Sequence, residues 1–193
     1  MEKDTLISNC KILIIGGSAG SLDVLIKILP HLDIPSFALV IVLHRKHTED
    51  NTLEELIAAK SIIPLKEVED KVEILPGYIY IAPSDYHLLF EKNNLLSLDT
   101  SEKVNYSRPS IDVAFESVAD AYGKAVVGVL LSGANADGTD GLIAIKNAGG
   151  IIIVQQPETA DMPFMPSHAV QNTSPDFIVD IPALLDLIKR INS

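Results

Sequence analysis

This sequence is poor in cysteine, in aromatic residues and in long apolar runs. Among 193 residues it has one cysteine, Cys10, no tryptophan and only 5% aromatic residues. A lone cysteine excludes an internal disulfide and is typical of a reducing compartment. No apolar run approaches the roughly 20 residues that span a bilayer, and the polar start lacks the apolar segment of a signal peptide. We therefore expect a soluble, cytoplasmic protein with no membrane insertion.

Basic residues are also in short supply. The chain has 15 Lys and Arg against 26 Asp and Glu, which gives a formal net charge of −11 at pH 7. Such a charge repels phosphate groups and argues against nucleic acid or an anionic membrane as partner. The five histidines are scattered and lack the spacing of metal ligands. The sequence therefore predicts no metal site.

Aliphatic residues are abundant, and 47% of the chain is apolar. This length and composition predict one domain over residues 1–193, without repeats or linkers. Apolar strands alternating with helices predict an α/β fold: a doubly wound, mainly parallel sheet with helices on both faces. A hairpin around Asn93-Asn94 predicts a small antiparallel annex, and a further short strand is expected near Ile62-Ile63. The main strands are expected at 12–15, 37–43, 78–82, 125–131, 151–155 and 177–179, and helices at 52–60, 111–122, 139–148, 167–171 and 182–191.

The stretch from Lys11 to Leu25 organises the rest of the chain. An apolar strand ends in Gly16-Gly17-Ser18-Ala19-Gly20, and a helical pattern follows. The glycines allow a sharp turn around the Ser18 hydroxyl, and unpaired N–H groups at the start of the helix point to the same place. Two interpretations follow from these residues: a nucleophilic serine, or a glycine-rich phosphate loop.

Polar residues that could perform acyl transfer follow three of the expected strands. Ser18 follows the first strand, His44 ends the second, and Asp137 follows the strand at 125–131. The carboxyl ends of parallel strands share one edge of the sheet, so these residues could form a nucleophile, a base and an orienting carboxylate. Each also has a purely structural explanation, as a helix cap, a strand-end histidine or an acid beside a helix dipole. His47 is a rival base.

Short motifs alone do not settle the chemistry. Residues 16–20 match the G-x-S-x-G nucleophile elbow, but the order Ser, His, Asp differs from that of α/β-hydrolases. Neither the dinucleotide fingerprint nor the P-loop pattern can be placed on these glycines.

Longer strings give the chain a family resemblance. They are I-I-G-G-S-A-G around Ser18, V-L-H at His44, L-P-G-Y-I-Y-I-A-P-S-D-Y-H-L over 75–88, R-P-S-I-D-V-A-F over 108–115, V-G-V-L-L-S-G-A-N-A-D-G-T-D-G over 127–141 and M-P at 165–166. In this order and spacing the chain resembles the catalytic domain of CheB-type protein-glutamate methylesterases.

The resemblance implies an enzyme that hydrolyses glutamate methyl esters on the cytoplasmic helices of chemoreceptors, releases methanol, needs no cofactor and in some members deamidates glutamine. Ser18 would be the nucleophile, His44 the general base and Asp137 its orienting partner. The backbone at Ala19 and Ala134 would lie near the oxyanion. Arg108 would border the cleft and attract acidic receptor segments.

Some positions depart from the family pattern. Ala19 replaces a usual hydroxyl residue, Ser21 a glycine, and Ser167-His168 a basic residue after the Met-Pro pair. Only ten residues precede the first strand, so we expect no receiver domain in this chain, and control by a partner such as a separate receiver protein or a receptor methyltransferase. The alternatives are a catalytically silent module that docks to receptors or a methyltransferase, and a phosphate or nucleotide binder.

Overall fold

The computed structural model describes residues 9–45 and 51–192. Its centre is a six-stranded sheet in the order β4-β2-β1-β7-β8-β9, in which every neighbouring pair is parallel. These strands are β1 (Ile12–Gly17), β2 (Ala38–Leu43), β4 (Ile79–Ile81), β7 (Val126–Leu130), β8 (Ile151–Gln155) and β9 (Phe177–Val179). The predicted parallel α/β architecture is confirmed.

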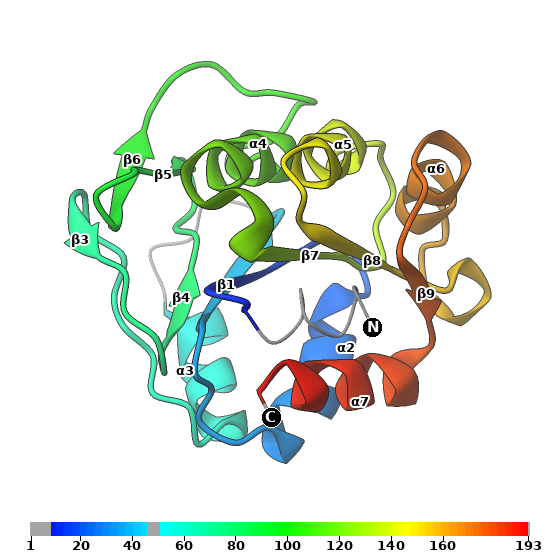
Figure 1. Ribbon diagram of the computed structural model, residues 1–193, viewed down its shortest axis with the longest axis horizontal. Helices are drawn as coiled ribbons and strands as arrows, with labels where there is room; N and C mark the ends of the chain where they lie inside the picture. Colours follow the sequence, from blue (N-terminus) through cyan, green and yellow to red (C-terminus); the bar gives the residue numbers. More distant parts are fainter. Residues whose placement is uncertain (1–8, 46–50, 193) are drawn as a thin grey trace.

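Helices cover both faces of the sheet (Figure 1). One face carries α4 (Ile111–Tyr122), α5 (Thr139–Asn147) and α6 (Phe164–Asn172), and the other carries α2 (Ser21–Ile28), α3 (Thr52–Lys60) and α7 (Ile181–Ile191). Short 3-10 turns lie at Leu29–His31, Gly123–Ala125 and Pro157–Thr159. No helix among the described residues is long and apolar enough to cross a bilayer.

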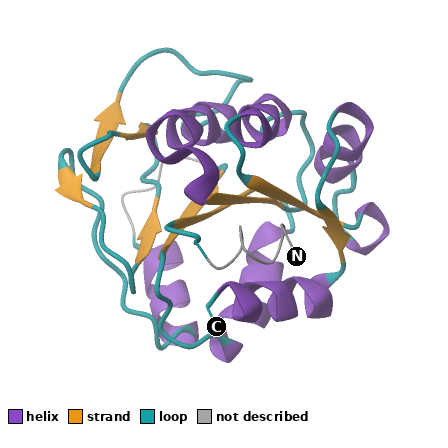
Figure 2. Ribbon diagram, in the orientation of Figure 1, coloured by secondary structure: helices purple, strands orange, loops and turns teal. Residues whose placement is uncertain are grey.

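A second, antiparallel sheet lies beside the main one (Figure 2). It contains β3 (Val72–Glu73), β6 (Leu95–Asp99) and β5 (His87–Phe90), in that order. The pair β5–β6 is the predicted hairpin. The strand predicted at Ile62-Ile63 is wrong: those residues form a bend, and the segment meets the main sheet only at an isolated bridge between Leu65 and Ile79.

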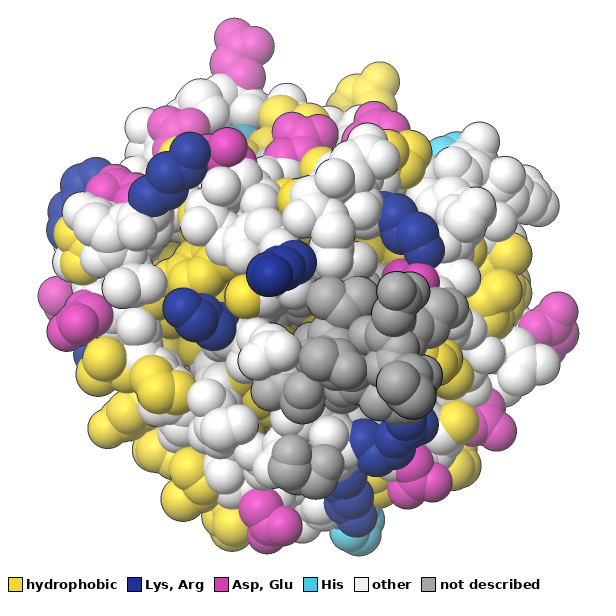
Figure 3. Space-filling model, viewed as in Figure 1, with side chains coloured by type: hydrophobic (Ala, Val, Ile, Leu, Met, Phe, Trp, Pro, Cys, Tyr) yellow, Lys and Arg dark blue, Asp and Glu magenta, His cyan; other side chains and the backbone are white. Residues whose placement is uncertain are grey.

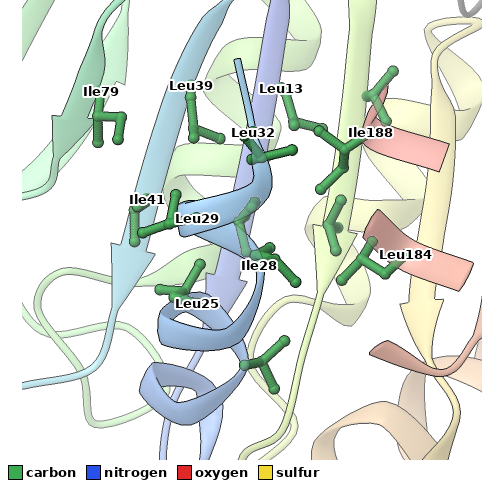
Figure 4. Close-up of a cluster of buried hydrophobic side chains, with 14 of the residues drawn as sticks. Leu13, Leu25, Ile28, Leu29, Leu32, Leu39, Ile41, Ile79, Leu184 and Ile188 are labelled. Atoms are coloured by element: carbon green, nitrogen blue, oxygen red, sulfur yellow. The ribbon is translucent and has the colours of Figure 1, made fainter. Parts of the chain in front are cut away.

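Alternation along the strands builds a core on each side of the sheet. In β1, Leu13 and Ile15 point to the cluster that includes α2 and α7, whereas Ile12 and Ile14 point to the cluster under α4 and α5. Figure 4 shows the first cluster, where side chains of α2 and α7 meet those of the strands. Because strands buried on both faces must be apolar at every position, this packing explains the continuous aliphatic runs in the sequence.

The order of the strands fixes where a site can form. From β1 the chain proceeds outward through β2 to β4, and it later returns to pair β7 on the other side of β1. The connections therefore diverge between β1 and β7, and ligand sites in open α/β sheets lie at the carboxyl ends of strands beside such a point. The turns after β1, β2 and β7 meet there.

Candidate active site

Ser18 occupies the turn between β1 and α2, next to His44 in the backbone. Gly17 and Leu43 are register partners in β1 and β2, and the His44 N–H donates to the Gly17 carbonyl at 3.1 Å. The chain reverses through Gly20, whose φ of 84° is in the left-handed region that glycine adopts easily. Ser18 is half-buried, and its hydroxyl makes no hydrogen bond to His44 or to any other described residue.

His44 and Asp137 form a direct pair. His44 Nε2 lies 2.6 Å from Oδ2 of Asp137, and the two side chains are 11% and 0% exposed. A carboxylate only accepts hydrogen bonds, so the imidazole Nε2–H donates to it and Nδ1 keeps a free lone pair. This is the tautomer in which a carboxylate orients a histidine base. His47, the rival base, lies outside the described residues.

The carboxylate of Asp137 is buried yet well supplied with donors. Oδ2 also accepts from the Ile111 N–H at 2.7 Å, and Oδ1 accepts from the Asp112 N–H at 3.0 Å and from Ser110 Oγ at 3.1 Å. Burial raises the pKa of Asp137, but the hydrogen bonds from His44 and from the two backbone N–H groups outweigh it and lower the pKa to about 2. Asp137 is therefore an anion seated on the first turn of α4.

Two exposed backbone N–H groups lie on the neighbouring turns. Ala19 follows Ser18 and Ala134 follows β7, and neither N–H donates to any group among residues 9–45 and 51–192. Ser132 joins these turns: its carbonyl accepts from the Ser18 N–H at 2.9 Å and its Oγ donates to the Ala19 carbonyl at 2.7 Å. Free donors beside a hydroxyl are the arrangement that an oxyanion requires.

Arg108 lines a pocket together with His44. The pocket has a volume of about 410 Å³ and is lined by His44, Arg45, Asp85, Lys103, Tyr106, Ser107, Arg108 and Pro109. Arg108 Nη1 donates to the carbonyls of Thr100 and Ser101 at 2.8 Å each. The arginine thus borders the cleft as predicted, with one end of its guanidinium engaged in holding the loop.

The chain matches the profile of the family described as CheB methylesterase over residues 13–188. It belongs to the CheB methylesterase family. A protein of Leptospira interrogans is 40% identical over 185 residues, which cover 95% of this chain and 96% of that protein. The Photorhabdus laumondii protein-glutamate methylesterase/protein-glutamine glutaminase is 36% identical over 96% of this chain, which spans 53% of that longer protein. The crystal structure of the Thermotoga maritima CheB methylesterase catalytic domain superposes with a TM-score of 0.87 at 31% identity, covering 93% of this chain and 98% of that one.

Two departures from the CheB pattern have clear structural places. Ser21, where the family usually has glycine, is fully buried, and its Oγ donates to the Ser132 carbonyl at 2.7 Å. His168, after the Met-Pro pair, has its Nδ1 2.9 Å from Thr139 Oγ1 at the start of α5, and its ring stacks on Phe164. Both residues are hydrogen-bonded to the turn or helix that follows β7.

Sequence reasoning missed four residues that contact the turns of this site. Ser110, Asp112 and Asn105 contact the Asp137 carboxylate, and Ser132 holds the Ser18 turn. Ser110 was predicted only as the cap of α4, which it also is, since its Oγ accepts from the Val113 N–H. A usable signal was the acid at position 112 beside that cap. Among the described residues, no group of three or more His, Cys, Asp or Glu side chains could hold a metal ion.

Proposed function

We propose that this chain is a protein-glutamate methylesterase that hydrolyses methyl esters of glutamate side chains on chemoreceptors, and that it deamidates glutamine at such positions. The observation that carries the proposal is the buried Asp137–His44 pair beside the Ser18 turn in a member of the CheB methylesterase family. The names of the Photorhabdus and Thermotoga relatives support both activities. A cytoplasmic location fits a receptor substrate that presents its helices there.

Ser18 is the nucleophile of this mechanism. Its Oγ attacks the ester carbonyl carbon while His44 Nδ1 accepts the hydroxyl proton, and Asp137 stabilises the imidazolium. The tetrahedral intermediate collapses, the bond to the methoxy oxygen breaks, and His44 returns the proton to give methanol. Water then attacks the acyl-enzyme with His44 as base and releases the glutamate carboxylate. For a glutamine substrate the leaving group is ammonia.

The free N–H groups of Ala19 and Ala134 are the oxyanion donors in this proposal. Donors fixed by the fold need no reorganisation when negative charge develops on the carbonyl oxygen, and one such donor is typically worth about 3 kcal/mol of transition-state stabilisation. The contacts of Ser132 to both Ser18 and Ala19 support this role, because they keep nucleophile and donor in one rigid turn.

The pocket beside His44 accepts the acidic part of the receptor segment. Three cationic side chains, Arg45, Lys103 and Arg108, and one carboxylate, Asp85, line it. Elsewhere the surface is acidic: Figure 3 shows acidic side chains scattered over one face with Lys and Arg between them. Local positive charge on a protein of net charge −11 favours a segment that carries carboxylates close to the esterified glutamate.

A single catalytic domain regulated by partners remains a prediction from the sequence. The partners proposed here are the methylated receptor, a receptor methyltransferase and a separate receiver protein. The 96% coverage of the Leptospira relative, against 53% of the Photorhabdus protein, is compatible with a catalytic unit that occurs in chains of both lengths.

The test is release of labelled methanol from receptor fragments methylated with a labelled methyl group. We expect turnover by the wild-type protein and a loss of at least about 10⁴-fold in Ser18→Ala. Ser36→Ala, an exposed serine outside the site, should retain full activity. Binding of the receptor without methanol release by the wild-type protein would favour the docking module instead, and an active Ser18→Ala would remove Ser18 as nucleophile.

A further inference from the structure

Helices α4 and α5 cap one another through two buried carboxylates. Asp137 precedes α5 and accepts from the N–H groups of Ile111 and Asp112 at the start of α4. Asp112, in the first turn of α4, returns the contact: its Oδ1 accepts from the N–H of Gly138 at 2.9 Å and of Gly141 at 2.8 Å. Each helix therefore satisfies the unpaired N–H groups of the other.

The close approach of the two helices depends on a glycine. A Cβ on Gly141 would lie 3.2 Å from the Asp112 Cα and would also clash with Phe115. Asp137 immediately precedes Gly138, whose N–H is held by Asp112. The position of the Asp137 backbone is thus coupled directly to the Asp112 carboxylate.

One amide joins the two carboxylates. Asn105 Nδ2 donates to Asp112 Oδ2 at 2.9 Å and to Asp137 Oδ1 at 3.1 Å. A primary amide nitrogen has two hydrogens, so both are used. Asn105 has a φ of 51°, a left-handed conformation that asparagine tolerates better than most residues.

These contacts divide the two oxygens of Asp137 by task. Oδ1 accepts from Asn105, Ser110 and the Asp112 N–H, which anchor the carboxylate to the protein. Oδ2 accepts from one backbone N–H and otherwise faces His44 Nε2 at 2.6 Å. Rotation of the carboxylate away from His44 would break the Oδ1 contacts.

We infer that Asp112 and Asn105 are positioning residues, which hold the Asp137 carboxylate in the orientation that binds His44. The inference rests on the proposed function for its kinetic consequence, but the orientation itself can be measured without any substrate. Neither residue touches the reacting atoms; both act through Asp137. A misplacement of about 1 Å in such a group can reduce turnover by about 100-fold.

The groups around Asp112 make its role electrostatic as well as steric. The negative side chains of Asp137 and Asp140 face it, and the donors from α5 and Asn105 surround it. Burial, together with the charge of Asp137, raises the pKa of Asp112 to about 7. A neutral replacement that keeps an acceptor oxygen is therefore less disruptive than complete removal of the side chain.

The test compares Asp112→Ala, Asp112→Asn and Asn105→Gly with two matched controls. Glycine at 105 keeps the left-handed backbone and removes only the amide. Asn94→Gly is the same change at another left-handed asparagine, in the β5–β6 turn, and Glu116→Gln neutralises an exposed acid of the same helix α4. We measure kcat and KM for methanol release, and the downfield proton resonance of the His44 Nε2–H···Asp137 hydrogen bond.

We expect Asp112→Ala and Asn105→Gly to lower kcat by about 10- to 100-fold with KM within about twofold, and to weaken or shift the downfield resonance. Asp112→Asn should lose less, because its Oδ1 can still accept from Gly138 and Gly141. If Asp112→Ala does not fold, Asn105→Gly and Asp112→Asn decide. An unchanged resonance and a kcat within twofold of wild type in these variants would overturn the inference. A wild-type protein without methanol release would sink the proposed function alone, because the resonance would still test the positioning.

Discussion

His44 and Asp137 are 93 positions apart in the chain, yet their side chains meet at 2.6 Å. The parallel sheet explains the meeting, since β2 and β7 flank β1 and end at the same edge. The contact is shorter than the usual N–H···O distance of about 2.9 Å, as expected for a hydrogen bond to an ionised acceptor. The pKa of Asp137, lowered to about 2, keeps that acceptor charged at any pH at which the protein works.

The first prediction concerns this pair. In Asp137→Asn, the amide oxygen can take the place of Oδ1 and its three donors, which leaves the amide nitrogen facing His44. Two N–H donors cannot face each other, so the imidazole must move its proton to Nδ1 and loses its base for Ser18. We expect kcat to fall by about 10⁴-fold, measured as methanol release, with an unchanged fold by circular dichroism. Asp140→Asn, an exposed acid in the first turn of α5, is the control; a loss below tenfold in Asp137→Asn would contradict the tautomer.

The second prediction concerns stability and pH. An aspartate in an unfolded chain has a pKa of about 3.9, whereas the pKa of Asp112 is raised to about 7 in the fold. Between these values the native state binds more protons than the unfolded state, so the contribution of Asp112 to stability declines as pH rises from about 4 to about 7. Asp137, with its lowered pKa of about 2, acts oppositely: its contribution is present above about pH 4 and is lost as pH falls towards 2.

Urea unfolding at pH 5 and pH 8 separates the two effects. The free energy of unfolding should fall less between these pH values in Asp112→Asn than in the wild type, because the substitution removes a group that is buried with a charge at high pH. Glu116→Gln should follow the wild type. An equal fall in Asp112→Asn and wild type would show that Asp112 does not titrate in this range.

Most of the fold could be predicted because local signals agreed with the long-range packing. Helix α4 begins and ends where predicted, between the Ser110 cap and Gly123, and strand β8 has its predicted limits. The short strand expected at Ile62-Ile63 is wrong because β-branched residues alone do not make a strand. A strand also needs an edge to pair with, and the free edge of β4 is met at Leu65 instead.

The site was predicted only in part, for a physical reason. Ser18, His44 and Asp137 could be placed at one edge because the ends of parallel strands must meet there. Asp112, Asn105 and Ser132 act through contacts that depend on how two helices cross and how a loop returns. Such contacts leave no periodic pattern in the sequence, and an acid in the first turn of a helix is favoured by the dipole alone.

The third prediction concerns Ser132, which links the turns after β1 and β7. Its Oγ donates to the Ala19 carbonyl and accepts from the Met162 N–H at 2.9 Å. Ser132→Ala leaves both backbone groups without this partner, so we expect the free energy of unfolding to fall by about 1–3 kcal/mol. We also expect kcat to fall more than KM changes, because the Ser18 turn loosens. Urea unfolding and methanol release test both points, with Ser36→Ala as control; a stable variant of unchanged kcat would contradict the link.

The fourth prediction concerns the pocket beside His44. Lys103 is exposed and makes no ion pair with another described residue, whereas Arg45 pairs with Glu54 and Arg108 binds backbone carbonyls. Lys103 is therefore the cation most available to an acidic substrate. Lys103→Glu should raise KM for a methylated receptor fragment with neighbouring carboxylates by about 5- to 10-fold, and leave hydrolysis of a small neutral ester unchanged. The difference should shrink in high salt, since exposed charges are screened. Lys92→Glu, the same charge change in the β5–β6 turn, should leave both KM values unchanged; an equal effect of the two variants would show that only overall charge matters, and not the pocket.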